Sequence, residues 1–228
     1  MPRLVDAAAD LFLGATCAGC GRPGWGVCAD CRLEIGESAP LPVTRPLPGF
    51  PTSFAGGRYL GSLAGVLVAY KERQALGCEA LLSGRLAAAL AALLSQTLPS
   101  IRPIVLIPVP SAPATERARG YSVTARLARR AAHRLAARTG LKVQVSRGLR
   151  QARRVADQAE LTASERLANL AGSFVAMPLR PAAFTVVVDD IVTTGASIAE
   201  AVRALRAVGI APLGAAVVAQ TPRRRPTL

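Results

Sequence analysis

Residues 184–198 have the sequence FTVVVDDIVTTGASI, and this stretch decides the fold class. It begins with a run of apolar residues, continues with the acids Asp189 and Asp190, and ends in a Thr- and Gly-containing turn. A continuous apolar run of this length is typical of a strand buried on both faces of a parallel sheet. The stretch therefore predicts a buried strand at 184–188 that leads through a polar turn into a helix.

The turn has the composition of a phosphate-binding site. Hydroxyls and backbone N–H groups gather where the helix begins, and the aligned peptide dipoles there favour an anion. Gly195 lets the backbone come close to a ligand. Asp189 and Asp190 would point to opposite faces of a continuing strand, so the strand must end before them if both contact one ligand, such as a ribose. The candidate phosphate-binding residues are Thr193, Thr194, Gly195, Ala196 and Ser197. The alternative is an ordinary strand-to-helix connection, with Asp and Thr as turn and cap residues.

Outward from this stretch, strands and helices alternate along the chain. The apolar run at 104–109 is bounded by prolines and has the length of a second buried strand. The other expected strands are 56–60, 142–146 and 213–219, and the expected helices are 62–71, 78–98, 122–138, 161–171 and 196–208. This order predicts an α/β fold with a mostly parallel central sheet flanked by helices.

Four cysteines near the N-terminus, Cys17, Cys20, Cys28 and Cys31, form the pattern C-x2-C-x7-C-x2-C. Each pair has a spacing that lets both thiolates face one ion, and four thiolates suit a structural zinc ion with no open position for substrate. Two disulfides, a redox dithiol or an iron–sulfur cluster are the alternatives. The fifth cysteine, Cys78, is expected to be a small buried residue.

Three parts are expected: a four-cysteine zinc-binding segment at 1–38, a Pro-rich linker at 39–55 and an α/β domain at 56–228. The chain of 228 residues is 51% hydrophobic, which suits one globular domain with a small appendage. Its longest runs without charged residues, 86–101 and 207–222, are shorter than the roughly 18 residues that a membrane span needs. Asp6 and Asp10 interrupt what would be the apolar part of a signal peptide. No membrane span and a cytoplasmic location are expected.

The formal net charge of +14 rests almost entirely on arginine, because the chain contains only two lysines, Lys71 and Lys142. Such a charge is compatible with a solvated arginine-rich surface and with an anionic ligand, and the sequence does not distinguish between these two explanations.

The stretch 184–198 resembles the signature by which type I phosphoribosyltransferases bind 5-phosphoribosyl-1-pyrophosphate (PRPP). With the cysteines, the chain resembles the competence protein ComF family, which is associated with DNA uptake. The further residues that carry this resemblance are Tyr70, Lys71, IPVP at 107–110, ERARGY at 116–121, Gln158, Leu161, Arg166 and Asn169. At 121–123 the chain has Tyr, Ser and Val where the family commonly has an aromatic residue, Asn and Gln, so no acceptor pocket is assigned to Tyr121, Ser122 or Gln158.

The resemblance implies a type I phosphoribosyltransferase-like fold that binds PRPP with Mg²⁺ and transfers phosphoribosyl to an unidentified acceptor, with a nucleobase as one candidate. Pro110, Ser111 and Ala112 would receive the pyrophosphate, and Arg117 and Arg119 would neutralise it. Together with Asp189 and Asp190, these arginines are the candidate catalytic residues. Catalysis would depend on positioning and charge neutralisation.

The alternative is a non-catalytic protein that binds single-stranded DNA through the arginine-rich helix at 122–138, or that senses PRPP. The low aromatic content of 4% disfavours a base-stacking surface. The single histidine, His133, is expected to lie at the surface or in the packing, without a catalytic role.

Overall fold

The computed structural model describes residues 15–45, 47, 49–97, 102–152, 169–177 and 184–222. Its centre is a six-stranded sheet with the strand order β1-β2-β8-β7-β3-β4. These strands are β1 (Leu41–Pro42), β2 (Ser53–Ala55), β3 (Ile104–Pro108), β4 (Val143–Val145), β7 (Phe184–Val192) and β8 (Gly214–Gln220). Only β1 is antiparallel to its neighbour, which confirms the mostly parallel sheet.

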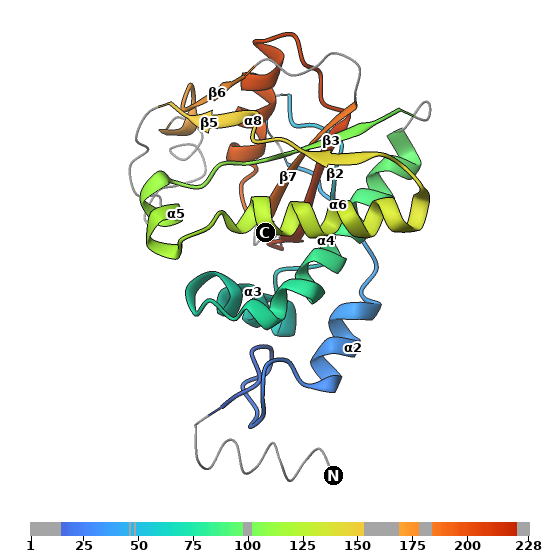
Figure 1. The fold of residues 1–228 in the computed structure, drawn as a ribbon, viewed down its shortest axis with the longest axis vertical. Helices are drawn as coiled ribbons and strands as arrows, with labels where there is room; N and C mark the ends of the chain where they lie inside the picture. Colours follow the sequence, from blue (N-terminus) through green and yellow to red (C-terminus); the bar gives the residue numbers. More distant parts are fainter. Residues whose placement is uncertain are drawn as a thin grey trace, which may run out of the picture.

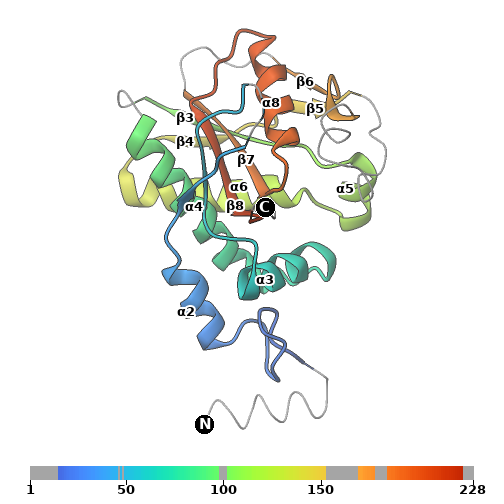
Figure 2. The same cartoon turned by 180° about the vertical axis from the view of Figure 1, so that it is seen from behind.

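Helices cover both faces of the sheet (Figures 1 and 2). Val186 and Val188 of β7 belong to the core that α4 (Glu79–Thr97) and α6 (Val123–Thr139) form on one face. Val187 packs on the opposite face, where α8 (Ala196–Arg206) lies. A separate antiparallel pair, β5 (Leu149–Gln151) and β6 (Phe174–Ala176), contacts α8. The apolar run of β7 is continuous because neither face of this strand meets solvent.

Strand β7 is longer than the sequence indicated. It continues through both acids to Val192, because its parallel pairing with β8 extends from Val186–Gly214 to Val192–Gln220. The expectation that the strand ends before Asp189 was therefore wrong. The acids lie within the strand, at the carboxyl edge of the sheet.

The Pro-rich stretch contributes to the sheet. β1 lies inside it, and Pro42 occupies an edge strand, where a missing N–H disturbs no central ladder. The strand expected at 56–60 lies instead at Ser53–Ala55, paired with β8. Gly56 already approaches α4 so closely that an added Cβ would lie 2.4 Å from the Arg85 carbonyl oxygen. Residues 56–59 still follow β8, because the Gly56 N–H donates to Val217 O at 2.9 Å and Arg58 pairs with Gln220.

The N-terminal part comprises a cysteine-containing loop, α2 (Ala29–Glu37), α3 (Gly61–Glu72) and the short 3-10 helix η1 (Leu76–Cys78). It lies beyond one end of the sheet in Figure 1. The buried Arg85 of α4 holds α2 to this end, because its guanidinium donates to the carbonyls of Gly36 (3.0 Å) and Gly56 (2.9 Å).

Two differences from the expected helices are local. The sequence did not indicate α5 (Pro113–Arg119), which begins with a proline and buries none of its residues. The helix expected at 161–171 lies outside the described residues except for 169–171. Within the part of the chain that the structure describes, only Leu76–Thr97 is long and apolar enough to cross a membrane. In the apolar 18-residue stretch of this helix, 56% is buried inside the protein. This helix packs against both the sheet and α6.

Candidate functional site

The acids of β7 meet a lysine from α3 at the carboxyl edge of the sheet. Lys71 Nζ lies 3.0 Å from Asp190 Oδ2, and the two side chains are 26% and 13% exposed. The backbone N–H of Asp190 donates to Asp189 Oδ1 at 2.8 Å, and the Thr124 hydroxyl of α6 lies 3.5 Å from the same oxygen. This arrangement forms a partly buried group of two carboxyls and one ammonium.

The two carboxyls differ in their electrostatic surroundings. Burial and the adjacent Asp190 charge raise the pKa of Asp189 to about 8, although the Asp190 N–H, Lys71 and Thr124 act in the opposite direction. Burial alone would lower the pKa of Lys71, but Asp190 and Asp189 raise it above its ordinary value. Lys71 is therefore an ammonium at neutral pH, and the Asp189 carboxyl titrates close to that range.

The turn after β7 opens a small hollow at the start of α8. A space of about 30 Å³ is lined by Asp189 and by the whole turn of residues 193–197. Helix α8 begins at Ala196 as expected, and the Ala196 N–H donates to the Thr194 hydroxyl at 3.3 Å. The hollow thus combines hydroxyls with the N-terminus of an 11-residue helix, which is a favourable place for an anion.

Gly195 has a further role that the sequence did not indicate. Its φ of +92° is in the left-handed region, where only glycine is unstrained. An added Cβ would lie 2.7 Å from Phe50 and 3.1 Å from Arg45, both in the Pro-rich stretch. A larger residue at this position would therefore disturb the turn itself, besides any effect on ligand approach.

Arg45 stabilises the turn through hydrogen bonds and was not among the expected site residues. Its side chain is buried, and its guanidinium donates to the carbonyls of Thr193 (2.7 Å), Thr44 (2.9 Å) and Thr221 (3.1 Å). It also reaches Val192 O at 3.4 Å and Gln220 Oε1 at 3.3 Å. The Pro-rich stretch thereby fixes the carboxyl ends of β7 and β8.

A larger cleft of about 770 Å³ lies at the carboxyl end of β3, the strand beside β7. Among the expected pyrophosphate-binding residues, Pro110, Ser111 and Arg117 line it. Ala112 instead serves as the N-cap of α5, and Arg119 donates to Glu72 at 2.8 Å. The structure thus separates the two arginines, since Arg117 lies at the cleft and Arg119 pairs with α3.

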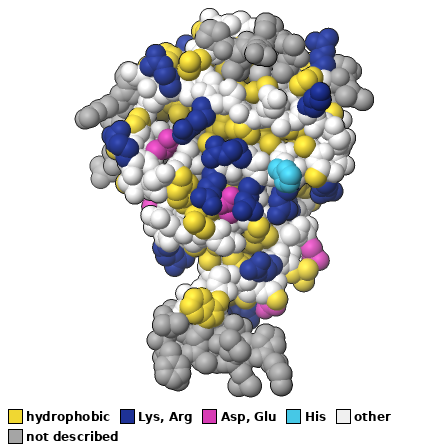
Figure 3. Space-filling view, viewed as in Figure 1, with side chains coloured by type: hydrophobic (Ala, Val, Ile, Leu, Met, Phe, Trp, Pro, Cys, Tyr) yellow, Lys and Arg dark blue, Asp and Glu magenta, His cyan; other side chains and the backbone are white. Residues whose placement is uncertain are grey.

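Further basic residues surround this cleft, including Arg129, Arg147 and Arg150. Basic side chains also gather over α6 in Figure 3, but Arg126 and Arg130 both pair with the buried Glu79, each at 2.5 Å. The charge of α6 is therefore partly neutralised within the protein. His133 is exposed on the same helix.

The residues that carried the family resemblance have mixed outcomes. Tyr121 and Ser122 line the cleft, and the Tyr121 ring lies 6.2 Å from that of Tyr70. Gln158, Leu161 and Arg166 lie outside the described residues, and Asn169 precedes β6. Lys71 lies beside the acids, a position that the sequence alone did not predict.

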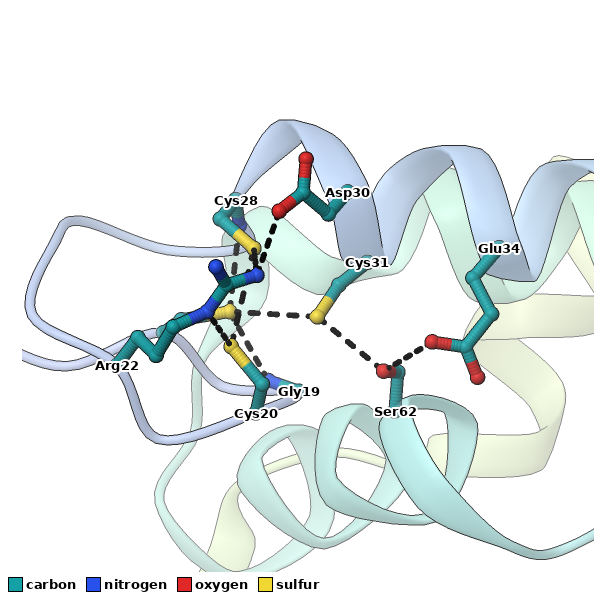
Figure 4. A network of polar contacts seen from close by, with 9 residues as sticks. Gly19, Cys20, Arg22, Cys28, Asp30, Cys31, Glu34 and Ser62 are labelled. Atoms are coloured by element: carbon teal, nitrogen blue, oxygen red, sulfur yellow. Dashed lines mark hydrogen bonds and ion pairs between the residues drawn. The ribbon is translucent and has the colours of Figure 1, made fainter. Parts of the chain in front are cut away.

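The four N-terminal cysteines converge, and Figure 4 labels three of them, Cys20, Cys28 and Cys31. Their sulfur atoms all lie within 4.8 Å of one another, and Cys17–Cys31 and Cys20–Cys28 are each 3.8 Å apart. A tetrahedron with zinc–sulfur bonds of about 2.3 Å has sulfur–sulfur edges of about 3.8 Å. All five cysteines are free, so the alternative of two disulfides is not what the structure shows.

Polar groups around the cluster suit thiolate ligands. The N–H groups of Gly19 and Cys28 donate to Cys17 Sγ at 3.4 and 3.2 Å. Hydrogen bonds from Arg22 lower the pKa of Cys20 to about 6, whereas burial raises the pKa of Cys31 to about 12. Four thiolates at these distances repel one another unless a cation lies among them, and the donor set fits zinc.

Comparison with known proteins agrees with this geometry. The phosphoribosyl transferase domain family matches residues 80–227. The matched region includes β3, the cleft loop, both acids and the turn, and it excludes α3 and the four cysteines. A search of curated proteins found no match. Since the match covers more than half of the chain, the protein belongs to the phosphoribosyl transferase domain family.

Proposed function

We propose that the protein binds PRPP with Mg²⁺ and transfers its phosphoribosyl group to an acceptor. The observation that carries this proposal is the adjacency of the acids and the phosphate-type hollow on β7 to the arginine-lined cleft on β3. The two strands are parallel neighbours, so their carboxyl ends lie at the same edge of the sheet. PRPP has a 5-phosphate, a ribose and a pyrophosphate in that order, and the proposal assigns the hollow, the acids and the cleft to these three parts.

In this proposal each part of PRPP has its own residues. The turn of residues 193–197 binds the 5-phosphate. Asp189 and Asp190 accept hydrogen bonds from the ribose hydroxyls, because both carboxyls lie close to the Lys71 ammonium although β7 continues through them. The loop at 110–112 and Arg117 hold the pyrophosphate as its bond to the anomeric carbon breaks and the bond to the acceptor forms. Mg²⁺, when bound, neutralises pyrophosphate charge. The protein contributes orientation and fixed positive charge, with no nucleophile of its own.

The four-cysteine cluster would hold one structural zinc ion, since its sulfur atoms all lie within 4.8 Å of one another and two pairs have the tetrahedral separation of 3.8 Å. A member of the ComF family, as the sequence resemblance implies, would act in the cytoplasm in connection with DNA uptake. Exposed arginines on α6, such as Arg134 and Arg138, support binding of single-stranded DNA as the second candidate function. The pairing of Arg126 and Arg130 with Glu79 reduces the charge available for that role.

Calorimetric titration with PRPP and Mg²⁺ tests the proposed function. The wild type should bind, and Asp190→Asn should bind about 10- to 150-fold more weakly, because a charge-assisted hydrogen bond to the ribose contributes about 1.5 to 3 kcal/mol. Glu37→Gln, an exposed acid on α2, is the matched control and should bind like the wild type. No Mg²⁺-dependent heat from the wild type at millimolar PRPP would reject the proposal, and single-stranded DNA would then be titrated instead.

The pH dependence of this binding should follow Asp189. The raised pKa means that the carboxyl is protonated below about pH 8, and a protonated acid accepts hydroxyl protons poorly. Affinity for PRPP with Mg²⁺ should therefore rise from pH 7 to pH 9, where the substrate phosphates are already ionised. Asp189→Asn should bind weakly with a nearly flat profile. An unchanged profile in this variant would show that another group titrates.

Arg117 should contribute to pyrophosphate binding because its planar donor group faces the cleft. Arg117→Ala is expected to weaken PRPP binding about tenfold or more, and to affect ribose 5-phosphate little. Arg129 lines the same cleft and therefore cannot serve as a control. The control is Arg138→Ala, in the exposed last turn of α6. Equal losses for PRPP and ribose 5-phosphate would place Arg117 outside the pyrophosphate site.

A further inference from the structure

Helix α3 connects the four-cysteine cluster to the acids of β7. It spans Gly61–Glu72, with Ser62 in its first turn and Lys71 in its last. Both the helix and the cysteines lie outside the region that matches the phosphoribosyl transferase domain, which begins at residue 80. The chain thus brings a cationic side chain to the candidate site from a part that the family match does not cover.

The first half of α3 is held by the cluster. The Ser62 hydroxyl donates to Glu34 Oε2 at 2.6 Å and lies 3.2 Å from Cys31 Sγ, as Figure 4 shows. Gly65 lies against the loop itself, because an added Cβ would be 2.6 Å from the carbonyl oxygens of both Ala18 and Gly19. Backbone oxygens of the loop therefore fix the distance between this loop and the helix axis.

The last turn of α3 carries Lys71 to the acids. Its ammonium pairs with Asp190 and also lies in the field of Asp189 and of the cationic Arg119 from α5. An ammonium has three donors, and Asp190 takes one of them, so the others can reach an oxygen of a ligand bound at the acids. Because the lysine is partly buried and held by a carboxylate, its position depends on where α3 lies.

We propose that Lys71 is part of the PRPP site and that the four-cysteine cluster positions it through α3. Lys71 orients the Asp190 carboxylate and donates to an oxygen of PRPP at the centre of the site. The cluster, held together by its metal, fixes the helix that carries this lysine. This inference rests on the proposed function and adds to it a binding residue and its support.

Lysine substitutions test the first part of the proposal by calorimetry with PRPP and Mg²⁺ on the zinc-loaded full chain. Lys71→Met should lower affinity at least tenfold and move the pH dependence of binding to higher pH, because Asp189 loses a cation that favours its ionised form. Lys71→Arg should restore part of both. The only other lysine, the exposed Lys142, provides the control, and Lys142→Met should bind like the wild type.

Glycine substitutions test the second part. Gly65→Ala should push α3 away from the loop and weaken PRPP binding several-fold, while elemental analysis still finds zinc at the wild-type stoichiometry. Gly84→Ala on α4 is the matched control, because its added Cβ meets nothing closer than 3.8 Å. Ser62→Ala removes the contacts with Glu34 and Cys31 and should shift affinity in the same direction as Gly65→Ala, by a smaller factor.

The outcomes separate the inference from the proposed function. A wild type without Mg²⁺-dependent PRPP binding overturns both. A wild type that binds, together with Lys71→Met of equal affinity and equal pH profile, overturns the role of Lys71 alone. Unchanged affinity in Gly65→Ala, with its melting temperature recorded to verify the substitution's effect on packing, overturns the positioning by the cluster.

Discussion

Loss of metal from the four-cysteine cluster is expected to unfold the N-terminal segment. Among residues 15–37 only a few apolar side chains are buried, including Val27 and Ile35, so the loop and α2 have little core of their own. Metal binding to such small sites is coupled to folding and contributes on the order of 10 kcal/mol in isolated zinc-binding peptides. Chelation should therefore release this segment while the sheet remains folded.

The only tryptophan reports this change. Trp25 lies in the loop between the two cysteine pairs and is 57% exposed, so its fluorescence follows the segment and not the core. Elemental analysis of the wild type should find about one zinc per chain. Cys20→Ser and Cys28→Ser should lose the metal. Without any chelator, their fluorescence spectra should match that of the wild type after chelation.

Cys78 provides the matched control, since it is buried in η1 and lies outside the cluster. Cys78→Ser should retain the metal and the wild-type fluorescence. Full metal content in both ligand variants would contradict the assignment of a four-thiolate site. Iron together with acid-labile sulfide in place of zinc would keep the four thiolate ligands but assign them to an iron–sulfur cluster.

Local sequence patterns were sufficient to predict most of the central sheet. The apolar runs of β3 and β7 and the helix stop at Gly140 after α6 are local signals, and all three have the expected structure. The turn at 193–197 could also be predicted from its own sequence, because hydroxyls and a glycine immediately precede a helix. These features depend on neighbours in the sequence, and tertiary packing only strengthens them.

The remaining features depend on contacts between distant parts of the chain. Strand β7 passes through its acids because β8 continues to pair with it, which no pattern within 184–198 encodes. Two strands of the sheet come from the stretch expected to be a linker, because they pair with each other and with β8. Lys71 belongs to the residues that carry the family resemblance, but its pairing with Asp190 follows only from the path of α3.

Arg45 is the clearest such case, since the carbonyl of Thr193 that it binds is 148 residues away in the sequence. Within a Pro-rich stretch, an arginine has the appearance of a solvated residue. Its side chain is instead 8% exposed and satisfies several carbonyl oxygens at the ends of β7 and β8. This contact between two distant parts of the chain could not be predicted from local sequence patterns.

Arg45→Met is expected to cause the largest loss at the phosphate turn. The methionine fills part of the space but donates nothing, so the part-buried carbonyls of Thr193 and Thr221 lose a donor. Val192 O still accepts from the Thr221 N–H. A buried acceptor left unsatisfied costs about 1 to 3 kcal/mol, and two part-buried carbonyls at the lower end of this range predict a loss of about 2 to 3 kcal/mol in the free energy of unfolding. PRPP affinity should fall as well, because Thr193 is no longer fixed.

Chemical denaturation and calorimetry at a temperature where the variant is folded measure the two effects separately. Arg58→Met is the matched control, because Arg58 is exposed and pairs with Gln220 through its backbone. The control should change the free energy of unfolding by less than about 0.5 kcal/mol.

The outcomes separate two roles of Arg45. If Arg45→Met loses stability but keeps wild-type PRPP affinity, Arg45 stabilises the sheet edge alone. If the variant loses affinity beyond the loss of folded protein, Arg45 also fixes the turn. Wild-type stability in Arg45→Met would mean that water or neighbouring donors satisfy these carbonyls, and the turn would then be rigid without the Pro-rich stretch.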